Sequence, residues 1–349
     1  MSSVDKSSGK PVLSVQLIVL IEIVWAVLAL LFFLLFSVTP QGQERPFWYS
    51  LGTSILEATS FLAAAALCFR NWSSPQIVSG RNVWLGIGLG MSCYFIGNLL
   101  FSYWELGLGL EPDVSPGDFF FILTYIFLLW GMMHAVVPRR LNLEVWQKGI
   151  VFAIAVVGIA IAAVLFAAQS SENTTTWLES PAYAQTAPAT PSTQSSPNMA
   201  PSPNPAPVMA PTANPPAANA KLSTSTNGEQ KPTPPKWATD LATQLQFLKK
   251  PVTGFYIVCD VLLLLLATAL LLAFWGGRFS QSWRMIAAAA FSLYIADIWF
   301  QWASNAPNYK SGSLPEVFWV FSGVLFGIGA ALEYDLSSRS RRSGSRRRA

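Results

Sequence analysis

The chain has 349 residues, of which 52% are hydrophobic and 11% are charged, and its mean hydropathy is +0.41. Soluble globular domains carry about 25% charged residues, so this composition excludes an ordinary soluble enzyme and predicts an integral membrane protein. One His and three Cys are too few for a zinc cluster, a haem-binding histidine pair or a disulfide framework. We therefore expect no metal and no cofactor.

Eight apolar segments follow one another along the chain, and each is long enough, at about 20 residues, to cross the hydrocarbon core of a bilayer. They lie at residues 13–37, 49–69, 82–104, 117–137, 147–168, 252–275, 284–304 and 315–333. Because these runs lack the alternation of a membrane barrel, the predicted fold class is all-α, a polytopic transmembrane helical bundle. The first segment carries no small-residue cleavage site, so we expect a span and not a signal peptide.

Lys and Arg are distributed unevenly between the connecting loops. Loops 70–81, 138–148 and 276–284 are basic, whereas loop 105–118 carries four acids and no cation. The positive-inside rule then places both termini in the cytoplasm, and an even number of spans agrees with that orientation. We expect a multi-pass protein of a bacterial plasma (inner) membrane or internal membrane.

A long polar stretch separates the fifth predicted span from the sixth. Residues 169–250 hold 14 of the 24 prolines amid Ala, Thr, Ser and Asn, a composition that cannot bury enough apolar surface to fold. We predict a disordered extracytoplasmic linker over 169–236 and a short amphipathic helix over 237–250, which is either interfacial or an extension of the next span. The remaining parts are a cytoplasmic tail (1–12), two membrane regions (13–168 and 251–334) and an Arg-rich cytoplasmic tail (335–349).

The two halves of the chain show an internal repeat. Glu57 and Arg81 are 24 residues apart, as are Asp260 and Arg284. Further matched positions are Tyr94 with Tyr294, Ser115 to Phe120 with Ser313 to Phe318, and Gly131 with Gly329. Because each unit would hold four spans, both would enter the membrane in the same direction, giving a parallel 4+4 repeat. The alternative is chance alignment of apolar helices.

Acidic residues within the predicted spans are the first candidate site, because charges at membrane depth are costly. They are Glu22, Glu57, Asp260 and Asp297, with Tyr94, Tyr294 and Asn98 as possible hydrogen-bond partners. Their role is either ligand binding and coupling or an interhelical hydrogen bond worth about 0.6 kcal/mol.

A second candidate site lies at the outer ends of the third and fourth spans, at Tyr103, Glu105 and Asp118. Glu105, Glu111 and Asp113, crowded beside Tyr103 and Trp104, would form a mouth for a cationic or amphipathic ligand. The alternatives are a capping box at Ser115 and Asp118 and an ordinary exposed acidic loop. In the C-terminal tail, cations next to a span are expected to bind anionic lipid headgroups and not nucleic acid. They are Arg341, Arg342, Arg346, Arg347 and Arg348.

The segments Phe101 to Leu106, Pro116 to Phe120 and Tyr125 to Gly131 resemble a known membrane region. It is the multi-span region that lies N-terminal to some bacterial diguanylate cyclases and histidine kinases. The resemblance implies a sensing bundle in which Tyr103, Glu105 and Asp118 are the matching positions. Because only a short Arg-rich tail follows the last predicted span, the signal would pass to a separate membrane or signalling protein.

Three functions are therefore open. The leading hypothesis is a non-enzymatic sensory or scaffold module that acts through a partner. The alternative is a small-solute or ion transporter of two parallel repeats, with Glu57, Asp260 and Asp297 as coupling groups. An intramembrane enzyme has the least support, because the chain holds no phosphate-binding loop, zinc-protease helix or nucleophile elbow.

Overall fold

The regular structure of the chain is helical in every part that the computed structural model describes. The described residues are 14–39, 45–111, 114–136, 144–170, 234–274, 280–304, 306 and 309–346. The α-helices are α1 (Val15–Phe36), α2 (Phe47–Ser73), α3 (Arg81–Ser102), α4 (Gly117–Val136), α5 (Val145–Ser170), α6 (Lys236–Leu245), α7 (Lys249–Ala273), α8 (Ser280–Ala303) and α9 (Val317–Arg346). A π-helical turn, Tyr103–Gly107, extends α3, and the 3-10 turns Gln246–Leu248 and Leu314–Glu316 precede α7 and α9.

Within the described residues, seven helices are long and apolar enough to cross a membrane. These spans are Val15–Phe36, Phe47–Ser73, Arg81–Gly107, Gly117–Val136, Lys236–Ala273, Ser280–Ala303 and Leu314–Arg339. The chain is thus an all-helical, multi-pass membrane protein. The predicted fifth span, 147–168, falls in α5, whose described apolar part, Val145–Ile161, is shorter than a span. A total of eight spans remains a prediction.

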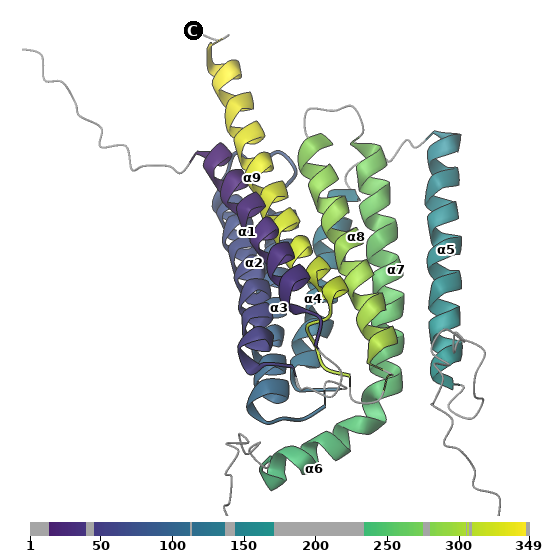
Figure 1. Cartoon of the computed structure of the whole chain (residues 1–349). Helices are drawn as coiled ribbons and strands as arrows, with labels where there is room; N and C mark the ends of the chain where they lie inside the picture. The colour runs from purple at the N-terminus through teal and green to yellow at the C-terminus, as the bar shows by residue number, and fades with distance from the viewer. Residues whose placement is uncertain are drawn as a thin grey trace, which may run out of the picture. The chain divides into compact units, whose positions relative to one another are not determined.

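The helices run alternately up and down. Figure 1 shows that the start of α1 and the end of α9 lie at one end of the bundle, while α6 lies at the opposite end. The helix α3 packs between α2 and α4, and α8 packs between α7 and α9. Contacts of α2 with α9 and of α4 with α7 join these two sets of three helices. The helix α1 packs mainly on α9, and α5 packs on α7, where Gly158 faces Val261.

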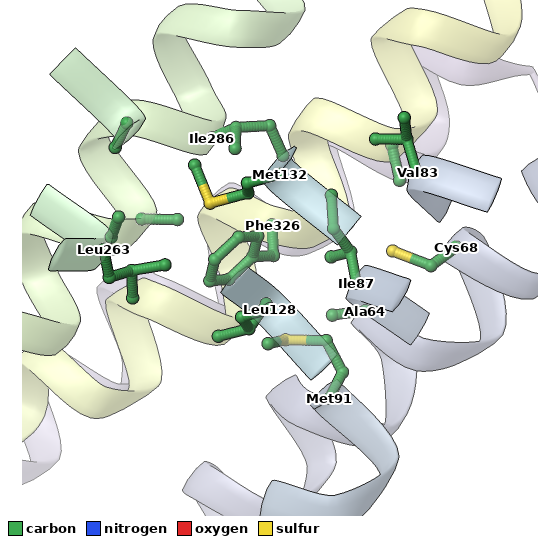
Figure 2. Packing of buried hydrophobic residues seen from close by; sticks show 14 of the residues in the cluster. Ala64, Cys68, Val83, Ile87, Met91, Leu128, Met132, Leu263, Ile286 and Phe326 are labelled. Carbon is green, nitrogen blue, oxygen red and sulfur yellow. The ribbon is translucent and has the colours of Figure 1, made fainter. Parts of the chain in front are cut away.

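The largest apolar cluster lies where the two sets of helices meet (Figure 2). Its members include Ala64, Cys68, Ile87, Met91, Leu128, Met132, Leu263, Ile286 and Phe326, which come from α2, α3, α4, α7, α8 and α9. In lipid, burial of apolar side chains gives little drive for helix association, so close packing and interhelical hydrogen bonds hold such a bundle together. The amide of Asn71 donates to the carbonyl oxygen of Ala330 at 2.8 Å, and Ser282 Oγ donates to that of Gly329 at 2.9 Å.

The short amphipathic helix predicted over 237–250 corresponds to α6 and the turn that follows it. Ala238 of α6 packs against Trp104 and Leu108, while Trp237 is exposed. Outside the described residues lie positions 171–233 of the predicted linker, the N-terminal tail, Arg347 and Arg348. The side chains of Arg341, Arg342 and Arg346 are also outside the description.

Candidate functional site: a carboxylate-lined cavity

A cavity of about 1220 Å³, counting its open mouth, lies between α2–α4 and α7–α9. Five carboxylic residues from five different elements line it. They are Glu57 of α2, Glu105 of the π-helical turn, Asp118 of α4, Asp297 of α8 and Glu316 of the turn before α9. Lys249 is the one basic residue among the described lining residues. The cavity is therefore a concentration of negative or proton-carrying groups within an apolar bundle.

Uncharged groups donate to these carboxyls. The Tyr94 hydroxyl donates to Glu57 Oε1 at 2.7 Å, and the Asn98 side chain is a second hydrogen-bond partner of Glu57. The Tyr256 hydroxyl donates to Asp118 Oδ1 at 2.6 Å. A neutral donor adds no positive charge, so a carboxyl group that ionises here would still attract a cation.

The loop between α8 and α9 is held at the cavity wall by Glu316. The carboxylate of Glu316 accepts from the Gly312 and Ser313 backbone N–H groups at 2.6 and 3.0 Å, from Ser313 Oγ and from the Tyr309 hydroxyl. Glu105 reaches the same loop and accepts from the Ser311 backbone N–H at 3.0 Å. Arg45 donates to the carbonyl oxygens of Lys310 and Ser311 from the other side. Side chains of both sets of helices thus fix this loop.

Replacing Glu316 by Ala should destabilise the protein by about 1–3 kcal/mol, because a capping box is lost and buried donors lose their acceptor. Thermal unfolding in detergent measures the change, with Glu316→Gln as the milder variant.

Burial, and next the Glu316 carboxylate, raise the pKa of the Tyr309 hydroxyl above its ordinary value. The stability that the Tyr309–Glu316 hydrogen bond contributes is therefore present at neutral pH. It is lost as the pH rises above about 10, where tyrosine ionises in the unfolded chain. A Glu316→Ala variant as stable as the wild type would show that the Glu316 cap is dispensable.

A second hydrogen-bonded group adjoins the cavity and joins α4 to α7 and α8. The Tyr125 hydroxyl lies 2.6 Å from Asp260 Oδ1 and also contacts Asp297 Oδ2. Trp319 Nε1 donates to the remaining oxygen of Asp297 at 2.7 Å. A hydroxyl has one proton to donate, so a proton on one of the two aspartates would let Tyr125 donate to one carboxyl group and accept from the other. We name Tyr125, Asp260 and Asp297 the Asp–Tyr–Asp triad.

The structure brings together several residues that the sequence singles out in two separate groups. Glu57, Tyr94 and Asp297 from the spans and Glu105 and Asp118 from the outer end all line the one cavity. Asp260 is buried beside it within the triad.

Three predicted site residues lie elsewhere. Glu22 is buried against Gly327 of α9, Tyr103 is 58% exposed, and Tyr294 packs in a cluster with Val261 and Leu264 of α7. Tyr103 and Glu105 are separated because residues two apart along a helical turn point to nearly opposite sides. Glu105 and Asp118 line the cavity and Tyr103 does not, and a ligand-binding mouth at the outer ends of these spans stays a prediction.

Several lining residues are not in the predicted site, notably Tyr125, Tyr256, Glu316 and Trp319. Glu316 carried a usable signal, because it matches Asp118 in the repeat. The aromatic residues carried none, since the chain is rich in aromatic residues throughout.

Within the described residues, no group of three or more His, Cys, Asp or Glu side chains is arranged to hold a metal ion. The acids instead surround a larger volume. Comparison with protein-family models, with characterised proteins and with solved structures gives no match. The function is therefore argued from the cavity.

Proposed function

We propose that this chain is a non-enzymatic membrane sensor that binds a small ligand in the cavity and acts through a separate protein. The observation that carries the proposal is the composition of the cavity wall, to which α2, α3 and α4 contribute on one side and α7, α8 and α9 on the other. A ligand there contacts both sets of helices, so its binding free energy can favour one packing of the two sets over another. The resemblance to sensor regions of signalling proteins agrees with this function.

Repeated features of the bundle support a parallel 4+4 repeat, with the cavity between the units. The contact of α2 with α9 has its counterpart in that of α7 with α4. Gly131 approaches α3 at Gly86, and its matched residue Gly329 approaches α8 at Ile286. Ser115 with Asp118 and Ser313 with Glu316 form the same cap at the starts of α4 and α9. A site between two repeats is common in membrane proteins that change conformation.

The positive-inside rule, applied to the basic loops, predicts that the start of α1 and the end of α9 lie in the cytoplasm. The cavity then opens on the extracytoplasmic side. A membrane-impermeant maleimide should then label Glu111→Cys in intact cells and Arg339→Cys only after permeabilisation. Both residues are exposed. Of the three native thiols, Cys68 and Cys259 are buried and Cys93 is half-buried, so the wild type supplies the background. The opposite labelling pattern would invert the topology and place the cavity mouth in the cytoplasm.

Crosslinking in native membranes tests the sensor. The tagged chain is purified in mild detergent and its partners are quantified by mass spectrometry, for the wild type and for Glu105→Gln. A partner in stoichiometric amount, with its yield altered by Glu105→Gln, is expected. Glu111→Gln is the matched control, because it removes an acid that does not line the cavity. Recovery of the chain alone would contradict the sensor function.

A second candidate function is proton-coupled transport, which the Asp–Tyr–Asp triad specifically favours. A group that holds a proton next to a ligand cavity at membrane depth is typical of proton relays in transporters. In proteoliposomes, a transporter would show solute-dependent proton movement that Glu57→Gln and Asp260→Asn abolish. If these variants leave flux unchanged, or if the wild type shows none, this function fails.

A further inference from the structure

A continuous row of five aromatic rings, which we call the aromatic belt, lines the cavity and extends from one set of helices to the other. The rings of Tyr94, Phe121, Phe101, Phe300 and Trp319 follow one another with centroid separations of 5.1, 6.4, 6.0 and 5.4 Å. All five line the cavity. The two ends of the belt are polar: Tyr94 donates to Glu57, and Trp319 donates to Asp297. The belt thus offers an apolar surface between two carboxyl groups.

An unsatisfied acceptor marks one end of this surface. Asn98 is only 5% exposed, lines the cavity, and has an Oδ1 atom without a hydrogen-bond partner in the structure. A buried polar atom of this kind costs about 1–3 kcal/mol unless a ligand or water satisfies it. Because Oδ1 only accepts and the neighbouring Glu57 carboxyl also accepts, a matching ligand must bring donors to this point.

The size and spread of these groups exclude a compact ligand. A metal ion requires several ligand atoms around one point, and no such group occurs among the described residues. The lining side chains instead come from α2, α3, α4, α7, α8 and α9, and contacts spread in this way suit an organic molecule. Ammonium groups carry three donors and no acceptor, and they are attracted to the faces of aromatic rings.

We propose that the cavity is a binding site for an amphipathic organic amine, with its ammonium group at Glu57 and Asn98 and its apolar body on the aromatic belt. This inference rests on the proposed function and names the ligand class of that site. The acids Glu105 and Glu316 lie closer to the loop and act on a cation by charge, since both are already hydrogen-bonded to backbone N–H groups. Lys249 and Arg45 limit the net negative charge of the cavity, so a single cationic group fits better than several.

Binding to purified protein tests the ligand class. The probe is dansylcadaverine, a primary amine with an aromatic body, and its N-acetylated form keeps the body without the charge. Fluorescence anisotropy is measured in nanodiscs of phosphatidylcholine, a lipid that carries no net charge. Saturable binding of the amine is expected, with an affinity at least about tenfold higher than that of the acetylated form, because a charge-assisted hydrogen bond is lost on acetylation.

Variants locate the ammonium group. Glu57→Gln should weaken amine binding about tenfold or more, while the matched control Glu111→Gln should leave it unchanged. Equal affinities for the amine and its acetylated form, or no saturable binding of the amine, would overturn the proposal with the wild type alone. Equal affinities of the wild type and a well-folded Glu57→Gln variant would overturn the assigned position.

The binding result is independent of the sensor test. Failure of amine binding, with a partner still sensitive to Glu105→Gln, would reject the ligand class and keep the sensor function. Amine binding without any partner would reject the sensor and keep the ligand class.

Discussion

Replacing Gly86 by Ala should destabilise the bundle by about 1–3 kcal/mol, the usual cost of overpacking a tight interior. A Cβ atom at this position would lie 2.5 Å from Gly131 Cα, 2.8 Å from Gly131 N and 2.9 Å from the Phe127 carbonyl oxygen. All three are backbone atoms, which no side-chain rotation can move. The helices α3 and α4 would therefore have to separate, with loss of contacts along their whole interface.

Thermal unfolding in detergent measures this change, with the reactivity of the buried Cys68 thiol as a reporter of α2 and α3 packing. Gly149→Ala is the control, because nothing lies within 4 Å of the added Cβ and Ala favours a helix by up to about 1 kcal/mol. Gly329→Ala should be intermediate, since the 2.7 Å contact there is with the end of the flexible Ile286 side chain. A Gly86→Ala variant that unfolds at the wild-type temperature would refute the close packing of α3 on α4.

Removing the Tyr125 hydroxyl should also have a large effect. Tyr125→Phe leaves Asp260, which is 1% exposed, and its neighbour Asp297 without the hydroxyl that both contact. We expect a loss of about 1–3 kcal/mol of stability, because buried polar groups are left with fewer partners. Thermal unfolding measures this change. The matched control is Tyr294→Phe. The Tyr294 hydroxyl is buried without a partner in the structure, so its removal should be neutral or stabilising.

Infrared spectroscopy tests the proton of the triad directly. At neutral pH the wild type should show a carboxylic acid C=O band, and Asp260→Asn combined with Asp297→Asn should lose the intensity of at least one acid. Glu111→Gln should retain the full band. An unchanged band in the double variant would show that neither aspartate carries a proton, and it would remove the physical basis for coupling to proton movement.

Orientation, span boundaries and the membrane class depend on local composition, and the sequence therefore contains most of that information. Apolar runs of span length predicted a helical membrane protein, and the all-helical structure with seven candidate spans confirms that class. Span count, orientation and repeat remain predictions. The cavity depends on contacts between residues far apart in the chain, so composition could not predict it.

The two tyrosines of the predicted repeat illustrate the limit. Tyr94 and Tyr294 match by sequence, yet Tyr94 donates to Glu57 at the cavity, and Tyr294 lies in an apolar cluster. Asp260 instead contacts Tyr125, which lies in a segment that carries the resemblance but was not among the predicted partners of the acids. The sequence alone predicted acids at membrane depth, because an apolar run with one carboxyl is visible in the chain. Only the tertiary structure decided which acids share a cavity, because the rotation and close approach of the helices select the partner of each side chain.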